Sequence, residues 1–179
     1  MKCKFCKTQF NIKYFNQKFC LLNNDCISAF NIYAKELNEK KEKKDWQKRK
    51  ATLKKELLSL SDWLKLAQQV FNKYIRERDK NKPCISCGNK LIGKFDAGHL
   101  WSAGGHSNLR FNEFNTNGQC VYCNQHLHGN ISMYRINFVK RYSPEILTQL
   151  DEIAHVTRKY NIQEIKELIE LYKNKLKNI

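Results

Sequence analysis

The chain has 179 residues, enough for one domain of ordinary size or two small ones, and its 33 Lys and Arg outnumber its 17 Asp and Glu to give a formal charge of +16. So large a surplus favours a polyanionic partner, because Lys and Arg that neutralise phosphates release counterions, although a merely soluble basic protein is the alternative. The sequence has no apolar run of 18 residues, no signal peptide and no lipidation motif, which argues against attachment to a membrane.

The first predicted element is a small zinc finger in residues 1–30. Its four expected ligands are Cys3, Cys6, Cys20 and Cys26, and the aromatic residues expected to cover the metal are Phe10, Tyr14, Phe15 and Phe19. The finger either contacts DNA through its lysines or serves as a structural or partner-binding unit, and both alternatives stay open.

All eight cysteines are predicted to be reduced and bound to metal, as in a cytosolic protein. No secretory signal is present, and the short gaps within the cysteine pairs are typical of metal-binding turns rather than of disulfides. Four thiolates around each of two zinc ions would contribute −2 per site and lower the formal charge only from +16 to +12. The basic character therefore survives metal binding.

Helices are expected on both sides of the central cysteines. The predicted segments are the finger (1–30), a basic charged helical linker (31–60), a helix plus nuclease-type core (61–142) and a C-terminal helical pair (143–179). The linker, with ten bases and five acids between residues 35 and 56, is typical of a solvated helix and could also follow a phosphate backbone. Ser61 is the predicted N-cap of the next helix, which Pro83 stops, and Ser143 and Asn161 begin the last two helices.

The second pair of Cys-x-x-Cys motifs predicts one closed tetrahedral zinc site, with ligands Cys84, Cys87, Cys120 and Cys123. Between the motifs, residues 91–100 are expected to form a strand, Gly104 and Gly105 a turn, and residues 111–115 the returning segment. A short helix is expected after Cys123, with Asn124 in its first turn and His128 on the same face.

His99 lies between these zinc motifs and is the predicted general base. Hydrolysis of a phosphodiester needs a base for the attacking water, and a neutral imidazole takes up a proton near pH 7. Asp96 and Asn124 offer the oxygen ligands that Mg²⁺ or Mn²⁺ prefers. The alternatives are a structural histidine and, for Asp96, a carboxylate that only accepts hydrogen bonds at the end of the strand.

The order of His99, Asn115, Cys120-x2-Cys123 and Asn124 resembles that of the His-Asn-His (HNH, ββα-metal) nucleases in their four-cysteine form. The resemblance implies that Asn115 holds the His99 loop in shape and that Asn124 binds metal where other members have their last histidine. Many such nucleases place Asp or His directly before the base. This chain has Gly98 there, and Asp96 lies three residues before the base.

A narrower resemblance is to the NinG (Rap) recombination endonuclease family of lambdoid phages. It rests on residues 75–79, 83–88, 96–99, 109–113 and 119–126 and is close over about residues 61–135. It implies a structure-specific endonuclease that cuts branched DNA during phage homologous recombination, and hence the cytoplasm of the host cell as its location.

Basic residues around the site are candidates for binding DNA. Arg110 and Arg135 are predicted to bind the scissile phosphate, or alternatively to pair with an acid such as Glu113. The remaining candidates are His126, for DNA contact or ordering of the site; His128, for the metal shell or phosphate, although a solvent-exposed role is favoured; His106, for phosphate; and His155, for a structural role.

Together these patterns predict an α+β protein with a zinc-stapled ββα-metal (HNH, treble-clef-like) core, flanking helices and a separate N-terminal zinc finger. The expected enzyme is a metal-dependent endodeoxyribonuclease that cuts recombination intermediates of the Holliday-junction or D-loop type, with two structural Zn²⁺ and one catalytic Mg²⁺ or Mn²⁺. DNA is the expected partner, without a membrane or a small-molecule cofactor, and homodimer formation is left open. The alternatives are a non-catalytic zinc protein that binds DNA and a sequence-specific HNH enzyme of restriction or homing type.

Overall fold

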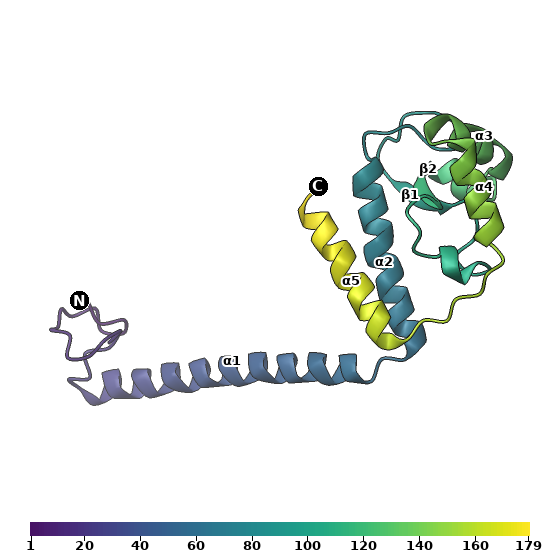
Figure 1. Cartoon of the computed structure of the whole chain (residues 1–179). Coiled ribbons are helices and arrows are strands. Elements are labelled where there is room, and N and C mark those ends of the chain that lie inside the picture. The colour runs from purple at the N-terminus through teal and green to yellow at the C-terminus, as the bar shows by residue number, and fades with distance from the viewer. The chain divides into compact units, whose positions relative to one another are not determined.

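A computed structural model describes the backbone of residues 1–179 and every side chain except those of Lys54 and Lys55. The chain forms two compact units, Met1–Leu57 and Leu58–Ile179 (Figure 1). The C-terminal unit combines helices with a two-stranded sheet, in agreement with the predicted α+β class. Among the described residues, no helix is both long and apolar enough to cross a membrane.

The N-terminal unit consists of the cysteine-rich segment and one long helix, α1 (Asn24–Glu56). The helix begins well before residue 31, where the linker was predicted to start, because the side-chain Oδ1 of Asn23 accepts a hydrogen bond from the backbone N–H of Cys26 at 2.8 Å and caps the first turn. Every side chain from Lys35 to Leu53 is exposed. This part of the helix therefore has no buried face and presents its charges to solvent.

Two long helices of the C-terminal unit, α2 (Leu60–Asp79) and α5 (Ile162–Lys177), pack side by side (Figure 1). Their shared core contains Ala67, Phe71, Tyr74 and Ile75 from α2 and Ile165, Ile169 and Tyr172 from α5. The predicted cap at Ser61 is wrong. Ser59 is the N-cap, because its hydroxyl accepts from the N–H of Asp62 while the Asp62 carboxylate accepts from the N–H of Ser59, a reciprocal pair that Ser61 cannot make.

A short antiparallel hairpin of β1 (Phe95–His99) and β2 (Thr116–Cys120) lies beside α2, with His99 opposite Thr116. The predicted strand over residues 91–100 is too long at its N-terminal end. Leu91 is buried against the cysteines, and Gly93 adopts φ +66°, a left-handed conformation that interrupts an extended strand. The connection between the strands contains one 3₁₀ turn, η1 (Ser107–Leu109).

After the hairpin come a one-turn π-helix, η2 (Tyr122–His126), and the helices α3 (Ile131–Arg141) and α4 (Pro144–Ile153). The helix expected after Cys123 therefore begins before it and ends before His128. Helix α3 was not predicted, although Tyr134 and Phe138, four residues apart, form its buried stripe. Tyr134 holds the hairpin in place, because its hydroxyl donates to the backbone carbonyl of Gly98 at 3.2 Å.

A buried ion pair joins the end of α2 to β2. Asp79 is fully buried, and its carboxylate accepts hydrogen bonds from the Arg78 guanidinium at 2.7 and 2.8 Å and from the backbone N–H of Gly118 at 2.8 Å. Burial opposes ionisation, yet the ion pair with Arg78 prevails and keeps the pKa of Asp79 below its usual value.

Replacing this carboxylate should destabilise the C-terminal unit strongly. Asp79→Asn leaves the Arg78 charge without its partner, so we expect a loss of about 3–5 kcal/mol in the free energy of unfolding, measured by urea unfolding of the zinc-loaded protein. The matched control is Glu77→Gln, which removes an exposed pair with Lys80 and should cost less than about 1 kcal/mol. Equal losses in the two variants would contradict this role of Asp79.

Candidate metal centres and active site

The central cysteines form a closed group suited to zinc. The sulfurs of Cys84, Cys87, Cys120 and Cys123 all lie within 4.8 Å of one another, and those of Cys87 and Cys120 are 3.8 Å apart. A tetrahedral site with Zn–S bonds of about 2.3 Å requires sulfurs roughly 3.8 Å apart. The four thiols therefore fit a zinc ion, which would join the first cysteine turn to β2 and η2.

Local backbone geometry creates the first cysteine turn. The N–H of Cys84 donates to the carbonyl of Asn89 at 2.7 Å, and the N–H of Gly88 donates back to the carbonyl of Cys84 at 3.0 Å. Gly88 adopts φ +75°, which a glycine reaches without strain. Beyond the turn, the side-chain amide of Asn130 donates to the sulfur of Cys123 at 3.6 Å, which ties the segment before α3 to this group of thiols.

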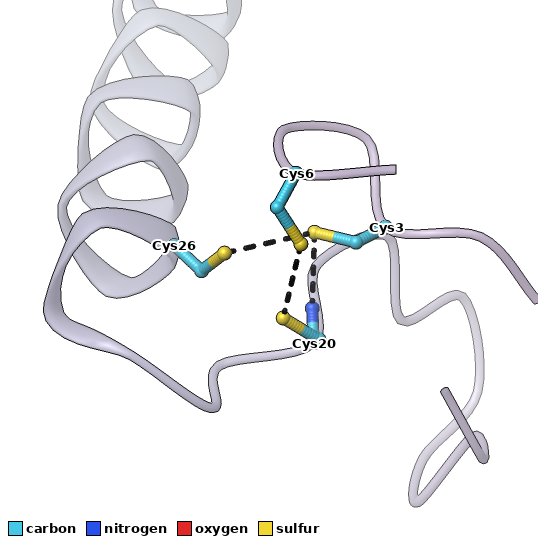
Figure 2. Close-up of side chains that lie close together, drawn as sticks. All are labelled: Cys3, Cys6, Cys20 and Cys26. Carbon is cyan, nitrogen blue, oxygen red and sulfur yellow. Dashed lines mark hydrogen bonds between the residues drawn. The ribbon is translucent and has the colours of Figure 1, made fainter. Parts of the chain in front are cut away.

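The N-terminal cysteines form a second group of the same kind. Figure 2 shows Cys3, Cys6, Cys20 and Cys26 pointing toward one another, with Cys26 in the first turn of α1; the Cys3–Cys26 and Cys6–Cys20 sulfur distances are 3.9 and 3.7 Å. The turn between Cys3 and Thr8 has the same backbone hydrogen bonds as the turn between Cys84 and Asn89, and Lys7, at φ +61°, takes the place of Gly88. This donor set also fits zinc.

His99 lines an open pocket of about 470 Å³. The other lining residues are Ala97, Leu100, Ser102, Ala103, Asn124, His128, Gly129 and Ile131. The imidazole Nε2 of His99 lies 3.1 Å from the backbone carbonyl of Arg110, and its ring lies near that of Phe71 on α2. Because a carbonyl can only accept, Nε2 carries the proton and Nδ1 is the unprotonated nitrogen of the neutral ring.

Electrostatics favour the neutral form of His99. Burial lowers the pKa of the imidazole below its usual value; the positive charge of Arg110 reinforces this effect, and the carbonyls of Arg110 and Ala97 oppose it. A neutral imidazole whose Nδ1 is unprotonated has the form that a general base needs to take a proton from water.

Asn115 is fully buried and closes the loop that follows His99. Its Oδ1 accepts from the backbone N–H of Trp101 at 2.8 Å, and its Nδ2 donates to the carbonyls of Trp101 and Leu109 at 2.9 and 3.0 Å. One side chain thus joins both ends of the segment 101–109, which supplies part of the pocket wall. These contacts are the ones that a loop-positioning role requires.

Asp96 and Asn124 are in direct contact, but they are placed differently with respect to His99. The Asp96 carboxylate accepts from the side-chain amides of Asn124 at 2.9 Å and Gln125 at 2.8 Å. Asn124 lines the pocket, whereas Asp96 does not. Residues three apart on a strand point to opposite faces, which explains why Asp96 and His99 do not share the pocket.

The structure gives a physical reason for Gly98, which stands directly before His99. A Cβ at this position would lie 2.0 Å from Oε1 of Gln119. Gln119 is buried, and its amide donates to the Ser86 hydroxyl and to the Gly129 carbonyl, both at 2.5 Å. Gln119 thus occupies the space that an acidic or imidazole ligand at position 98 would need. That Gln119 fills this space was not predicted from the sequence. The available signal was a polar residue in a strand that is otherwise buried.

The two arginines expected near the scissile phosphate make protein contacts, and neither pairs with Glu113. The Arg110 side chain donates to the Ala103 carbonyl at 3.1 Å, and Arg135 forms a bidentate ion pair with Asp151. Glu113 instead binds the Tyr74 hydroxyl at 2.8 Å and the ammonium group of Lys175. The alternative that Arg135 pairs with a nearby acid is therefore confirmed, with Asp151 in place of Glu113, whereas Arg110 contacts a backbone carbonyl instead of an acid.

The other histidines fall into two groups. His126 and His128 are exposed after Cys123; His126 lies near the Tyr122 ring, and His128 lines the His99 pocket although it lies outside the helical turn. His106 and His155 lie together around Trp101, with a ring separation of 6.0 Å, and the Nδ1 of His106 donates to the Ala154 carbonyl at 2.7 Å. His106 is thus held by the fold outside the His99 pocket.

Comparison with known proteins gives a consistent picture. The family described as Bacteriophage Lambda NinG protein matches residues 1–179. The Protein ninG of Escherichia phage 933W is 37% identical over 192 residues, covering 99% of this chain and 92% of the relative. Those of Escherichia phage lambda and Salmonella phage P22 are 42% and 40% identical over 119 and 121 residues, covering 66% of this chain and 58% of each relative. No solved structure matches the chain.

Proposed function

The chain belongs to the NinG family, and from this premise and the geometry of the His99 pocket we propose that it is a metal-dependent HNH-type endonuclease that cuts branched DNA. The observation that carries the proposal is the state of His99. Its Nε2 is bound to the Arg110 carbonyl, which leaves Nδ1 as the unprotonated nitrogen, and Asn124 lines the same open pocket. These are the parts that phosphodiester hydrolysis needs: a base, an oxygen ligand for a cation and space for a phosphate.

In the proposed reaction, Nδ1 of His99 takes a proton from the water whose oxygen attacks phosphorus. The bond between phosphorus and the 3′-oxygen breaks, the 3′-oxygen leaves and takes a proton from solvent, and His99 later releases its proton. When bound, Mg²⁺ or Mn²⁺ stabilises the charge that develops on the departing oxygen. The thiols of the zinc sites take no part in the chemistry, and Asn115 holds the loop of the base in place.

Asn124 and Asp96 are proposed to hold the divalent cation, with different roles. Because Asp96 accepts from Nδ2 of Asn124, the Oδ1 of Asn124 remains available as a ligand in the pocket. Asp96 then acts mainly by orienting Asn124, as outer-shell carboxylates do at other metal sites, or reaches the cation after a side-chain rotation. His128, on the same pocket, is the further candidate for the cation or the phosphate.

A branched substrate is supported by charge and by the family resemblance rather than by a base-reading element. The formal charge of +16 and the exposed basic surface of α1 suit contact with several phosphates. Arg135 is paired with Asp151, so it would reach a phosphate only by leaving that pair. A homodimer would present two pockets to two strands of a junction.

The deciding experiment compares the cutting of a four-way junction and of a linear duplex by the full chain, with magnesium added or withheld. We expect cutting of the junction only with magnesium. Asn124→Ala should lower the rate at least about 10-fold, the lower end of what loss of a metal's supporting groups costs. The control is Asn81→Ala, an exposed position outside the pocket, and zinc content is checked in every variant.

The outcomes separate the alternatives. Tight binding of the junction without magnesium-dependent cutting would contradict the proposal and favour a non-catalytic zinc protein. Cutting of the linear duplex at one defined sequence would favour an HNH enzyme of restriction or homing type. An equal rate in Asn124→Ala and wild type would leave the nuclease but remove Asn124 from the cation site.

A further inference from the structure

The N-terminal finger exposes aromatic side chains that the sequence was expected to place over its metal. Phe10 and Phe19 are buried beside the cysteines as predicted. Tyr14 and Phe15 are not, since Tyr14 is 48% exposed and Phe15 is 94% exposed. The prediction that these two rings cover the zinc site is therefore wrong. At 94% exposure the Phe15 ring contributes nothing to the core, so both of its faces are open to a ligand.

The loop that carries these rings is held in one conformation. Gln17 is 3% exposed; its Oε1 accepts from the backbone N–H of Lys13 at 2.8 Å, and its Nε2 donates to the Phe19 carbonyl at 2.9 Å. The Gln17 N–H also donates to the Tyr14 carbonyl at 3.3 Å, and Asn16 takes the left-handed turn conformation at φ +66°. The buried glutamine thus presents Tyr14 and Phe15 to solvent on a preorganised turn, which lowers the entropic cost of binding.

The charge around the turn indicates the class of ligand. Residues 1–30 contain the lysines Lys2, Lys4, Lys7, Lys13 and Lys18 and a single acid, Asp25. Lys13 precedes the aromatic pair directly, and the lysines at positions 4 and 18 both lie over the Tyr33 ring. Exposed rings on a basic finger match nucleic acid, which offers phosphates to the lysines and base faces to the rings.

We propose that Tyr14 and Phe15 form a stacking site for DNA base faces that are exposed at branch points and in single strands, while lysines of the finger contact the backbone. The inference rests on the proposed function, because it takes the substrate to be branched DNA. Bases in a linear duplex are already paired and stacked, so exposing one requires free energy to break its pairing and stacking. The bases of a single strand are unpaired, and the base pairs at the branch point of an unstacked junction lack a stacking neighbour on one face, so both offer a base face to an aromatic side chain. The finger would therefore contribute preference for branched DNA without reading sequence.

The test measures affinity of the full chain for a four-way junction, a single strand and a linear duplex, without magnesium so that no cutting occurs. Phe15→Ala should weaken binding to the junction and the single strand about 5- to 150-fold, the range that one lost base–aromatic stack implies, and change binding to the linear duplex little. Phe15→Trp should keep the affinity. Leu22→Ala, which removes another exposed apolar side chain (71%) of the same finger, is the matched control and should behave as wild type.

The results discriminate this inference from the nuclease proposal. The stacking site would be overturned, even in a protein that cuts junctions, by any of three results. These are an unchanged affinity of Phe15→Ala for the junction, an equal loss of affinity in Leu22→Ala, and an equal loss of affinity of Phe15→Ala for the linear duplex. Selective loss in Phe15→Ala in a protein that never cuts would support the stacking site and refute the nuclease. Because Phe15 lies outside the core, its removal should leave the zinc content and the thermal unfolding temperature unchanged. If Phe15 had a structural role, its removal would change them.

Discussion

His99→Ala is expected to lower the rate of junction cutting by about 10²–10⁴-fold, the contribution of a positioned general base. The variant loses the only side chain proposed to take the proton from the attacking water. Binding of the junction should change little, because the phosphate contacts proposed for the lysines remain. The measurement is a single-turnover rate with magnesium, beside the affinity measured without it.

His155→Ala is the matched control, because it removes an exposed histidine outside the His99 pocket and should keep the wild-type rate. Equal cutting by His99→Ala and wild type would contradict the role of the base. A pH profile adds a second check. Burial favours neutral His99 and lowers its pKa, so the base should remain active below the usual histidine value of about 6.5 and lose activity only at a lower pH.

Loss of the central zinc site is expected to unfold the C-terminal unit. A structural zinc contributes about 10–16 kcal/mol in small zinc domains, which is comparable with the whole stability of a typical domain, about 5–15 kcal/mol. We therefore expect the double variant Cys84→Ser, Cys123→Ser to lose one zinc, most of its near-ultraviolet circular dichroism and all cutting. Zinc analysis, circular dichroism and the junction assay together measure this.

Cys26→Ser is the corresponding change in the finger, which belongs to the other compact unit. It should also lose one zinc but keep the C-terminal fold and the rate of the chemical step, while DNA is bound more weakly. A fully folded, active double variant without its central zinc would show that hydrophobic packing suffices for this unit. Unfolding of both units by Cys26→Ser would show that their stabilities are coupled.

Local sequence signals predicted several elements well. Ser143 and Asn161 cap α4 and α5 as expected, since each side chain accepts from a backbone N–H three residues later. The start predicted for α2 was two residues too late, because Ser59 and Ser61 both precede Asp62 and serine is a good N-cap at either position. The three-residue spacing from Ser59 to Asp62 is the one that allows the reciprocal hydrogen bonds, and it selects Ser59. The unforeseen α3 has an apolar stripe but no capping signal, as Asn130 precedes it at φ +44° without a side-chain cap.

Cysteine spacing and the positions of His99, Asn115 and Asn124 were sufficient to indicate two four-thiol groups and one candidate site. These signals lie within short motifs whose geometry the chain itself dictates, such as the turn at Gly88. The tertiary structure alone decided that Asn124 shares the His99 pocket while Asp96 does not, that Gln119 fills the space beside Gly98, and that Phe15 is exposed. Each of these outcomes depends on contacts between segments distant in sequence, or on which side of an element meets another. A single sequence carries no direct signal of such contacts.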